Sequence, residues 1–353
     1  MIPPFLWRAF RANETAVHEL NYLFWECTTR CNLHCRHCGS DCFASSADSD
    51  MPLEDFLKAF DTIPRESIAK PFTVVLTGGE PVLRPDIEEI GRALRSRGVS
   101  WSIVSNGWFY DEQKHKALMA AGLGALTISL DGLEESHDWM RGRSGSFLRA
   151  RRAIELAAAE KRLNFDVVSC INRRNLSELE QMYSLLTSLG VKQWRLFSII
   201  PIGRAASDKE MLLSAEEFRS LLEFIKNKRA DKSAPMKVTF SCEGHLGKYD
   251  SAVRDTPFFC RAGINIASVL IDGTICACPN IDRKIFGQGN IYKDNFFRVW
   301  EEGFELFRSR EKWARKGSCA ECKLFRDCLG GGMHNWHGDI SDGPLVCLRD
   351  LAL

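Results

Sequence analysis

The alternation of short apolar runs with segments of helical periodicity constrains the fold of this chain more than any other feature. Six runs have the length and composition of buried strands, and they cover residues 23–25, 72–76, 101–104, 126–130, 165–168 and 194–200. A capping box of Ser214 and Glu217 starts a further helix after the sixth run. Strands that alternate with helices form parallel βα units, so we predict an α/β fold, either doubly wound or curled into a full or partial barrel. In each form the loops after the strands carry the functional site.

The pattern changes near residue 235. A short strand is expected at 237–241, a hairpin around 271–273, one helix near 296–307 and then a cysteine-rich tail. We therefore divide the chain into an N-terminal extension (1–20), a core domain (21–235) and a smaller C-terminal domain (236–353).

The charge balance excludes several classes of partner. The 353 residues include 47 Lys and Arg against 46 Asp and Glu, a net charge of +1, so no overall field attracts nucleic acid or an acidic membrane. The N-terminus lacks the uninterrupted apolar segment of a secretory signal, and no stretch has the roughly 18 apolar residues that span a bilayer. We therefore expect a cytoplasmic protein without membrane insertion. Its 14 cysteines are then expected to bind metal or do redox chemistry rather than form disulfides.

Three cysteines directly follow the first predicted strand: Cys31, Cys35 and Cys38. Thiolates this close on one loop can surround a single soft metal centre. A tetrahedral zinc ion would need a fourth ligand, for which the sequence offers His34, His37, Cys27 and Cys42. A four-iron cluster held by three cysteines instead keeps one iron open for another ligand.

This spacing, with three residues and then two between the thiols, resembles the motif of the radical S-adenosylmethionine (SAM) superfamily. In that family the open iron binds the amino and carboxylate groups of SAM, and the reduced cluster cleaves SAM to a 5′-deoxyadenosyl radical. Further segments after predicted strands match, including residues 105–107 and 201–205, so the resemblance covers about residues 20 to 210. It implies a [4Fe-4S] cluster on the three cysteines and a partial (β/α)6 TIM-like barrel.

Six residues of the matching segments are candidates for binding SAM by the same resemblance. The family segment that approaches the methionine amino group corresponds to Gly78, Gly79 and Glu80. Glycines let the backbone come close to a ligand, and a carboxylate suits an ammonium group. The family residues near the ribose and carboxylate of SAM correspond to Ser129, Asp131 and Arg141. Without the resemblance, the first segment is a strand-ending turn and the second a loop with a helix cap.

Seven further cysteines lie past residue 255: Cys260, Cys276, Cys278, Cys319, Cys322, Cys328 and Cys347. Their pattern resembles the SPASM extension of peptide-modifying radical SAM enzymes, which holds auxiliary iron-sulfur clusters. The resemblance makes the last four a full ligand set for one auxiliary cluster and assigns Cys260 and Cys278 to a second. Gly332 stands where the pattern has one more cysteine, so we name Cys276 as a third ligand and His334 as a candidate fourth. An open iron, a smaller cluster and a structural zinc ribbon are the alternatives.

The remaining cysteines and the acid-base groups have less specific roles. Four cysteines fit the pattern of buried structural thiols: Cys27, Cys42, Cys170 and Cys242. Candidate proton-transfer groups are Glu243, His245, Asp282 and His337. The sequence favours none of them, so the catalytic residues stay unassigned.

Together these features predict a radical SAM enzyme that modifies a peptide or protein, assisted by one or two auxiliary clusters and supplied with electrons by a flavodoxin or ferredoxin. The alternatives are modification of a small metabolite or cofactor precursor, and a non-catalytic zinc or iron-sulfur scaffold. Sulfatase-maturing members carry an aspartate after the cysteine that corresponds to Cys278, and Pro279 in its place disfavours oxidation of a sulfatase serine or cysteine. About 20 residues before the first strand are too few for the leader-binding domain of many peptide-modifying members. A peptide is therefore expected to bind through a partner or the enzyme's own surface.

Overall fold

One curved sheet runs through the computed structural model, which describes residues 3–42, 50–68, 71–241 and 243–353. Its strands are β1 (Tyr22–Thr28), β2 (Thr73–Gly78), β3 (Ser100–Ser105), β4 (Ala125–Ser129), β5 (Asn164–Ile171), β6 (Gln193–Ser198), β7 (Lys237–Phe240), β8 (Ile266–Val269), β9 (Thr274–Cys276) and β10 (Gly289–Asn290). They lie in the order β10-β9-β8-β1-β2-β3-β4-β5-β6-β7. The strands from β8 to β7 pair in parallel, and β9 and β10 add an antiparallel edge.

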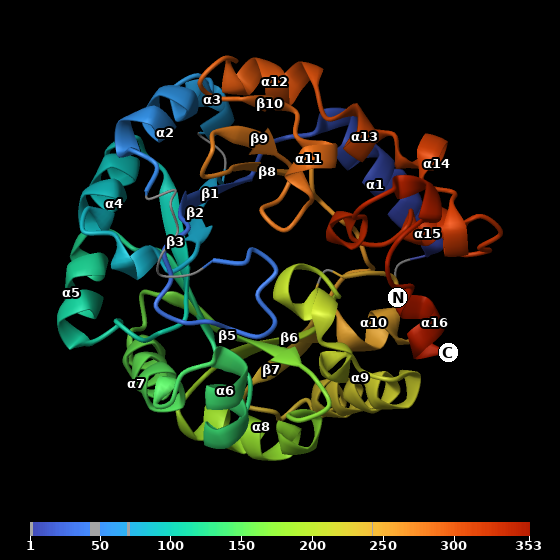
Figure 1. Ribbon diagram of the computed structural model, residues 1–353, viewed down its shortest axis with the longest axis horizontal. Coiled ribbons are helices and arrows are strands. Elements are labelled where there is room, and N and C mark those ends of the chain that lie inside the picture. The colour runs from blue at the N-terminus through green and yellow to red at the C-terminus, as the bar shows by residue number, and fades with distance from the viewer. Residues whose placement is uncertain (1–2, 43–49, 69–70, 242) are drawn as a thin grey trace.

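The six predicted runs form β1 to β6, which confirms the α/β fold with a central parallel sheet. Strands β7 and β10 are the two ends of the order, so the sheet stays open as a partial barrel (Figure 1). The strand expected at 237–241 is β7, which continues the sheet beside β6 although the sequence division placed it in the C-terminal domain. A short apolar run does not reveal which strand it will pair with. The boundary between residues 235 and 236 itself stays a prediction.

Helices surround the strands of the barrel (Figure 1). They are α2 (Leu53–Phe60), α3 (Arg65–Ile68), α4 (Ile87–Ser96), α5 (Glu112–Ala120), α6 (Glu134–Arg141), α7 (Ser146–Ala159), α8 (Leu179–Ser188) and α9 (Ala215–Ala230), of which α9 begins with the predicted capping box. Buried tryptophans on the strands fix individual helices. Trp25 of β1 stacks on Phe56 of α2 with ring centroids 4.1 Å apart. Trp101 of β3 packs against Gly91 of α4, where a Cβ atom would lie 2.4 Å from the ring.

The C-terminal part adds short elements at both ends of the strand order, beside β9 and β10 and also beside β7 and α9 (Figure 1). Its helices are α10 (Asp250–Val253), α11 (Arg283–Phe286), α12 (Phe296–Glu302), α13 (Glu305–Arg308), α14 (Arg310–Trp313), α15 (Phe325–Cys328) and α16 (Leu348–Ala352). The predicted hairpin is the antiparallel pair β8–β9, with Gly273 in the turn at φ +81°. The prediction of a single helix near 296–307 is wrong. The chain forms α12 and α13 instead, because Phe304 takes a left-handed conformation (φ +64°) between them.

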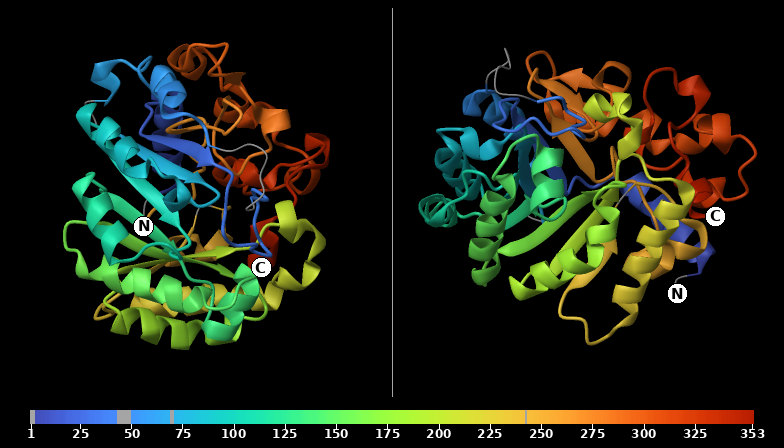
Figure 2. Two further views of the ribbon diagram at one scale, coloured as in Figure 1. Left: turned by 60° about the vertical axis from the view of Figure 1, so that its left-hand side comes forward. Right: turned by 60° about the horizontal axis from the view of Figure 1, so that its bottom comes forward.

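The first helix, α1 (Pro4–Val17), packs on the C-terminal part rather than on the barrel strands. Trp7 donates to the Phe258 carbonyl oxygen at 3.5 Å, and Arg8 pairs with Asp327 at 2.9 Å. Figure 1 and the right view of Figure 2 both show this dark-blue helix among the orange and red segments. Within the described ranges, no helix has the length and apolar character needed to cross a membrane.

Candidate active site

The loop after β1 carries the three thiols predicted to bind a cluster. Cys35 is buried, whereas Cys31 and Cys38 are half-buried. Arg204 holds the backbone of this loop: its Nε donates to the Cys35 carbonyl oxygen (2.6 Å) and its backbone N–H to the Cys38 carbonyl oxygen (3.0 Å). Gly203 permits this approach, because a Cβ atom there would lie 2.3 Å from the Cys38 oxygen. The fold therefore positions the loop through its backbone.

Gly78 is the last residue of β2, and Gly79 follows it. Both lie against the backbone at the start of the same loop. Gly78 has a φ of +118°, and a Cβ atom on it would lie 2.0 Å from the Thr28 carbonyl oxygen. A Cβ atom on Gly79 would lie 2.1 Å from the Arg30 carbonyl oxygen. The backbone N–H groups of Gly79 and Glu80 donate to these two oxygens, both at 2.8 Å. The close backbone approach expected of the glycines is thus made to the cysteine loop, which they help to position.

Glu80 is buried beside the loop, with 1% of its surface exposed. Its Oε1 accepts hydrogen bonds from the Val82 N–H (3.2 Å) and the Ser105 hydroxyl (2.8 Å), and its Oε2 accepts one from the Asn106 N–H (2.7 Å). The side-chain amide of Asn106 also lies 3.9 Å from the Cys31 sulfur. Burial raises the pKa of Glu80 to about 7, against the lowering effect of these hydrogen bonds. Glu80 therefore caps the turn after β2, and a cationic ligand would stabilise its charge.

Asp131 and Arg141 form a buried ion pair next to Cys35. Arg141 Nη2 lies 2.5 Å from Asp131 Oδ2, and Arg141 Nη1 lies 3.7 Å from the Cys35 sulfur. Asp131 also accepts a hydrogen bond from the Cys170 N–H (2.8 Å). Burial opposes ionisation of Asp131, but Arg141 and the neighbouring histidines hold the pKa of this carboxyl below its usual value. A charged pair therefore lies against one of the predicted cluster ligands.

Cys170 and His37 complete this side of the site. Their ligand atoms and a carboxylate oxygen of Asp131 all lie within 4.8 Å of one another. Burial lowers the pKa of His37 to about 4, so its ring is neutral at pH 7. The sequence interpretation of Cys170 as a structural thiol missed this contact, because Asp131 and His37 lie far from Cys170 in the chain and approach it only in the folded protein.

The residues around the loop suit a bound cluster with SAM. No disulfide joins cysteines of the described segments, and burial raises the pKa of Cys31 to about 12, so a metal centre has to displace the proton of this thiol. Among the described residues, His37 Nδ1 and Arg141 Nε are buried without a hydrogen-bond partner. Ser129 ends β4 two residues before Asp131, at the same edge of the sheet. A polar ligand bound beside the three thiols would give these unpaired nitrogen atoms hydrogen-bond partners.

The C-terminal tail gathers four of the predicted cluster ligands. One small enclosed cavity is lined by Cys319, Cys322, Cys328 and Cys347. Burial and then the three neighbouring thiols raise the pKa of Cys319 to about 11. Arg349 donates from Nη1 to the Cys322 sulfur at 2.8 Å. Four thiols around one enclosed space fit a cluster in which every iron has a protein ligand.

Cys260 lies beside the turn that contains Gly332. The backbone N–H of Met333 donates to the Cys260 sulfur at 3.5 Å. A Cβ atom on Gly332 would lie 2.5 Å from Cε1 and 2.9 Å from Nδ1 of His334. The imidazole therefore occupies the space in which a side chain at position 332 would begin. Burial lowers the pKa of His334 to about 4, so the ring is neutral and able to act as a ligand.

Cys276 and Cys278 differ in their surroundings. Cys276 is fully buried, and its thiol donates to the Phe286 carbonyl oxygen at 3.7 Å. Cys278 follows β9 and is half-buried. The ligand role of both thiols stays a prediction, and Cys276 would have to give up its contact with α11 to fulfil it.

Of the four acid-base candidates, Glu243 lies closest to the barrel strands in the chain, following β7. Its Oε2 accepts a hydrogen bond from Ser198 at 2.5 Å, and its carbonyl oxygen accepts one from the Gly332 N–H at 2.8 Å. Burial raises the pKa of Glu243 to about 8. The other three lie elsewhere: His337 faces Asp282 at 3.7 Å, and His245 lines the four-cysteine cavity. Cys242 lies outside the described residues.

Two family profiles match the chain. The radical SAM superfamily matches residues 25–186, and the SPASM iron-sulfur cluster-binding domain matches residues 260–323. The mycofactocin maturase MftC of Mycolicibacterium smegmatis is 30% identical over 314 residues, which cover 88% of this chain and 77% of that protein. The chain belongs to the radical SAM superfamily.

This radical SAM protein also resembles relatives with other names. The AdoMet-dependent heme synthase of Nitratidesulfovibrio vulgaris is 25% identical over 346 residues, covering 92% of this chain and 91% of that protein. The crystal structure of Streptococcus suis SuiB bound to precursor peptide SuiA superposes with a TM-score of 0.69 at 15% identity, covering 93% of this chain and 76% of SuiB. The matches confirm the predicted fold and its cofactors: a [4Fe-4S] cluster, SAM and auxiliary iron-sulfur clusters.

Two residues of the matching segments received no role in the sequence analysis but position the candidate site. Asn106 connects Glu80 to Cys31, and Arg204 holds the cysteine loop. Both lie in matching segments after predicted strands, and a polar side chain at the end of a buried strand was the signal available for them. Only the folded chain shows that their partners are in the loop after β1.

Proposed function

We propose that this radical SAM enzyme uses a 5′-deoxyadenosyl radical to modify a peptide or protein substrate. The observation that carries the proposal is the set of three thiols after β1, with Glu80 and the Asp131–Arg141 pair against them. The peptide is supported by the similarity to a maturase at 30% identity. The SuiB structure, which shares the fold, was solved with a precursor peptide.

In this proposal Cys31, Cys35 and Cys38 hold the SAM-binding cluster, and Cys319, Cys322, Cys328 and Cys347 hold an auxiliary cluster. When bound, the cluster and SAM supply the radical that abstracts hydrogen from the substrate. Gly78, Gly79 and Glu80 bind the amino end of SAM, while Ser129, Asp131 and Arg141 bind its ribose and carboxylate groups. Electrons come from a flavodoxin or ferredoxin.

A second candidate substrate is a cofactor precursor of the tetrapyrrole class. The observation in its favour is the similarity to AdoMet-dependent heme synthase, which extends over more than nine-tenths of both chains. Both candidates use the same radical chemistry, so they differ only in what the mouth of the barrel accepts.

One assay separates the two substrates. The anaerobic enzyme is given SAM, dithionite and either peptides encoded by neighbouring genes or an iron porphyrin with carboxylate side chains, and 5′-deoxyadenosine is measured together with the substrate mass. We expect a peptide to increase 5′-deoxyadenosine at least about tenfold and to change mass. Stimulation by the porphyrin alone, with a loss of mass from it, would replace the peptide proposal by the second candidate.

His334 is proposed as a ligand of the second auxiliary centre, together with Cys260, Cys276 and Cys278. Because the imidazole lies where a side chain at position 332 would begin, His334→Ala is expected to change the redox titration and paramagnetic spectrum of that centre. A neutral ligand in place of a thiolate leaves a cluster less negative and easier to reduce. The spectrum of the Cys319 to Cys347 cluster is expected to stay unchanged.

The double variant His334→Ala with Gly332→Cys is the matched control for this ligand. Gly332→Cys alone would place its Cβ atom 2.5 Å from that ring. Removal of the ring takes this contact away and leaves the Glu243 carbonyl oxygen 2.9 Å from the Cβ position, so the turn has to shift slightly to accept the thiol. We expect the double variant to recover the iron content of the wild type with a lower midpoint potential. Equal iron content and identical titrations of wild type and His334→Ala would exclude histidine ligation.

A further inference from the structure

Two buried arginines converge on the turn that carries Cys328. Arg11 comes from α1 and Arg310 from the start of α14, and they are 5% and 4% exposed. Arg11 donates to the carbonyl oxygens of residues 326 and 327, the latter at 2.6 Å. Arg310 donates to the carbonyl oxygens of residues 329 and 331. The four carbonyl groups lie on both sides of Cys328 in the chain.

Neither guanidinium has a carboxylate partner within ion-pair distance among the residues that the structure describes. Asp327, the nearest acidic residue in the chain, pairs instead with Arg8 at 2.9 Å. The Nε of Arg310 is buried with no hydrogen-bond partner in the same described set. Burial and the charge of Arg310 lower the pKa of Arg11, against the raising effect of nearby acidic groups. Two cations are thus buried close together, and in the described part of the chain no carboxylate pairs directly with either, an arrangement that is destabilising unless another charge compensates it.

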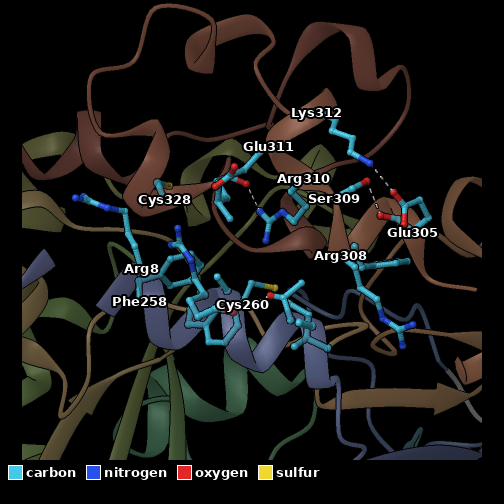
Figure 3. Close-up of a pocket in the computed structure, with 18 residues that line it drawn as sticks. Arg8, Phe258, Cys260, Glu305, Arg308, Ser309, Arg310, Glu311, Lys312 and Cys328 are labelled. Carbon is cyan, nitrogen blue, oxygen red and sulfur yellow. Dashed lines mark hydrogen bonds and ion pairs between the residues drawn. The ribbon is translucent and has the colours of Figure 1, made fainter. Parts of the chain in front are cut away.

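The two arginines line one pocket with Cys328 and Cys260. Figure 3 shows Cys328 and Arg310 on the C-terminal side of this pocket, with Cys260 below them. Its lining holds Arg8, Arg11, Arg308, Arg310 and Lys312 against only Glu305 and Glu311, so its charge is positive. Arg349, which donates to the Cys322 sulfur, differs because it pairs with Asp350. The uncompensated charge is therefore concentrated at Arg11 and Arg310.

We propose that Arg11 and Arg310 are positioning residues that compensate the negative charge of the cluster on Cys319, Cys322, Cys328 and Cys347 and raise its reduction potential. This inference rests on the proposed function, since it requires that cluster. A four-iron cluster with four thiolates is negative in both oxidation states and becomes more negative on reduction. A fixed buried cation therefore stabilises the reduced form more than the oxidised form. The cluster becomes a better electron acceptor, and α1 becomes part of its redox environment.

The test is the midpoint potential of this cluster in the full-length protein. The SAM-binding cluster is first removed by replacing its ligands Cys31, Cys35 and Cys38 with alanine. The spectroscopic signal of the C-terminal cluster is then identified as the one that Cys347→Ala abolishes. In this background we expect Arg310→Gln and Arg11→Gln each to lower the reduced-to-oxidised ratio at a given potential about tenfold. For a one-electron couple, this corresponds to a midpoint about 59 mV lower.

Two further variants separate charge from structure. Arg310→Lys keeps the charge with a different hydrogen-bond geometry, so its midpoint is expected to stay near the wild-type value. Arg308→Gln is the matched control in the same pocket, because Arg308 donates to backbone carbonyl groups of residues 300, 301, 303 and 263, away from Cys328. We expect it to leave the midpoint unchanged.

The outcomes distinguish this inference from the function on which it rests. Loss of iron from the C-terminal cysteines in the background protein itself would contradict the auxiliary cluster. Full iron content with an unchanged midpoint in both Arg→Gln variants would overturn the role of the arginines alone. An equal fall of the midpoint potential in Arg308→Gln would also overturn the role of the two arginines, since the effect would then not depend on proximity to Cys328. Arg11→Gln keeps the test decisive if Arg310→Gln does not fold.

Discussion

Replacement of Cys31, Cys35 and Cys38 together by alanine is expected to abolish the formation of 5′-deoxyadenosine completely. Only a cluster with three protein ligands keeps an iron open for SAM, and these thiols lie on the loop that Arg204 and Gly203 hold over the site. The four-cysteine centre lies in the C-terminal tail and shares no ligand with this loop. We therefore expect the triple variant to retain auxiliary iron and to lose one cluster per chain. Iron and sulfide analysis, absorption spectra and an anaerobic SAM cleavage assay measure these changes.

Cys27→Ala is the matched control for this loss. Cys27 lies on β1 just before the loop, is fully buried, and donates from its thiol to the Thr77 carbonyl oxygen at 3.5 Å. Burial raises the pKa of its thiol to about 12, as it does for Cys31. We expect this variant to cleave SAM at the wild-type rate with unchanged iron content. SAM cleavage that survives in the triple variant would rule out Cys31, Cys35 and Cys38 as ligands of the cluster that binds SAM.

Glu80→Gln is expected to show the second largest effect, a fall in SAM affinity of at least about tenfold, or about 1.4 kcal/mol. Both carboxylate oxygens accept hydrogen bonds from protein groups, so the amide of glutamine has to point an N–H group at a donor. A buried group left unsatisfied in this way costs about 1–3 kcal/mol, and the negative charge that we propose to face the amino group of SAM is lost as well. Calorimetric titration of SAM into the reconstituted enzyme measures the affinity, and thermal unfolding measures the stability.

Glu89→Gln provides the comparison, because Glu89 is exposed on α4 and its replacement removes the same charge from the same βα unit. We expect it to leave both SAM affinity and stability unchanged. If Glu80→Gln loses stability but binds SAM as the wild type does, Glu80 acts only as the cap of the turn after β2. Its assignment to SAM would then be wrong.

The strands of the barrel and the position of the cysteine loop can largely be predicted from the local sequence pattern. Apolar runs bounded by helix signals identify β1 to β6, and three closely spaced thiols after β1 indicate the candidate metal centre. What the pattern cannot show is which residues meet across the sheet. The contact of Asn106 with Cys31 connects positions 75 residues apart, and that of Arg204 with Cys35 connects positions 169 apart.

The local sequence pattern also fails to predict secondary structure where two backbone conformations have similar energies. The residues of α12 and α13 are compatible with one continuous helix, but burial of Phe304 among Trp300 and Phe307 stabilises a left-handed residue that breaks it. A single non-glycine residue in that conformation costs of the order of 1–3 kcal/mol, which the packing of three aromatic rings offsets here. Such a choice depends on tertiary contacts.

The docking of α1 on the C-terminal tail also has a consequence for the order of folding during synthesis. The hydrogen bonds of Arg11 connect residues 315 and 316 positions apart, so this arginine finds its carbonyl partners only when nearly the whole chain has left the ribosome, whereas Trp7 already finds Phe258 earlier. Strands β1 to β6 can meanwhile pair with neighbours that are close in sequence, because low contact order favours early pairing. We expect α1 to complete its docking last, so that in a ribosome-bound chain stalled before residue 320 Arg11 would still lack the carbonyl groups that it binds in the full-length chain.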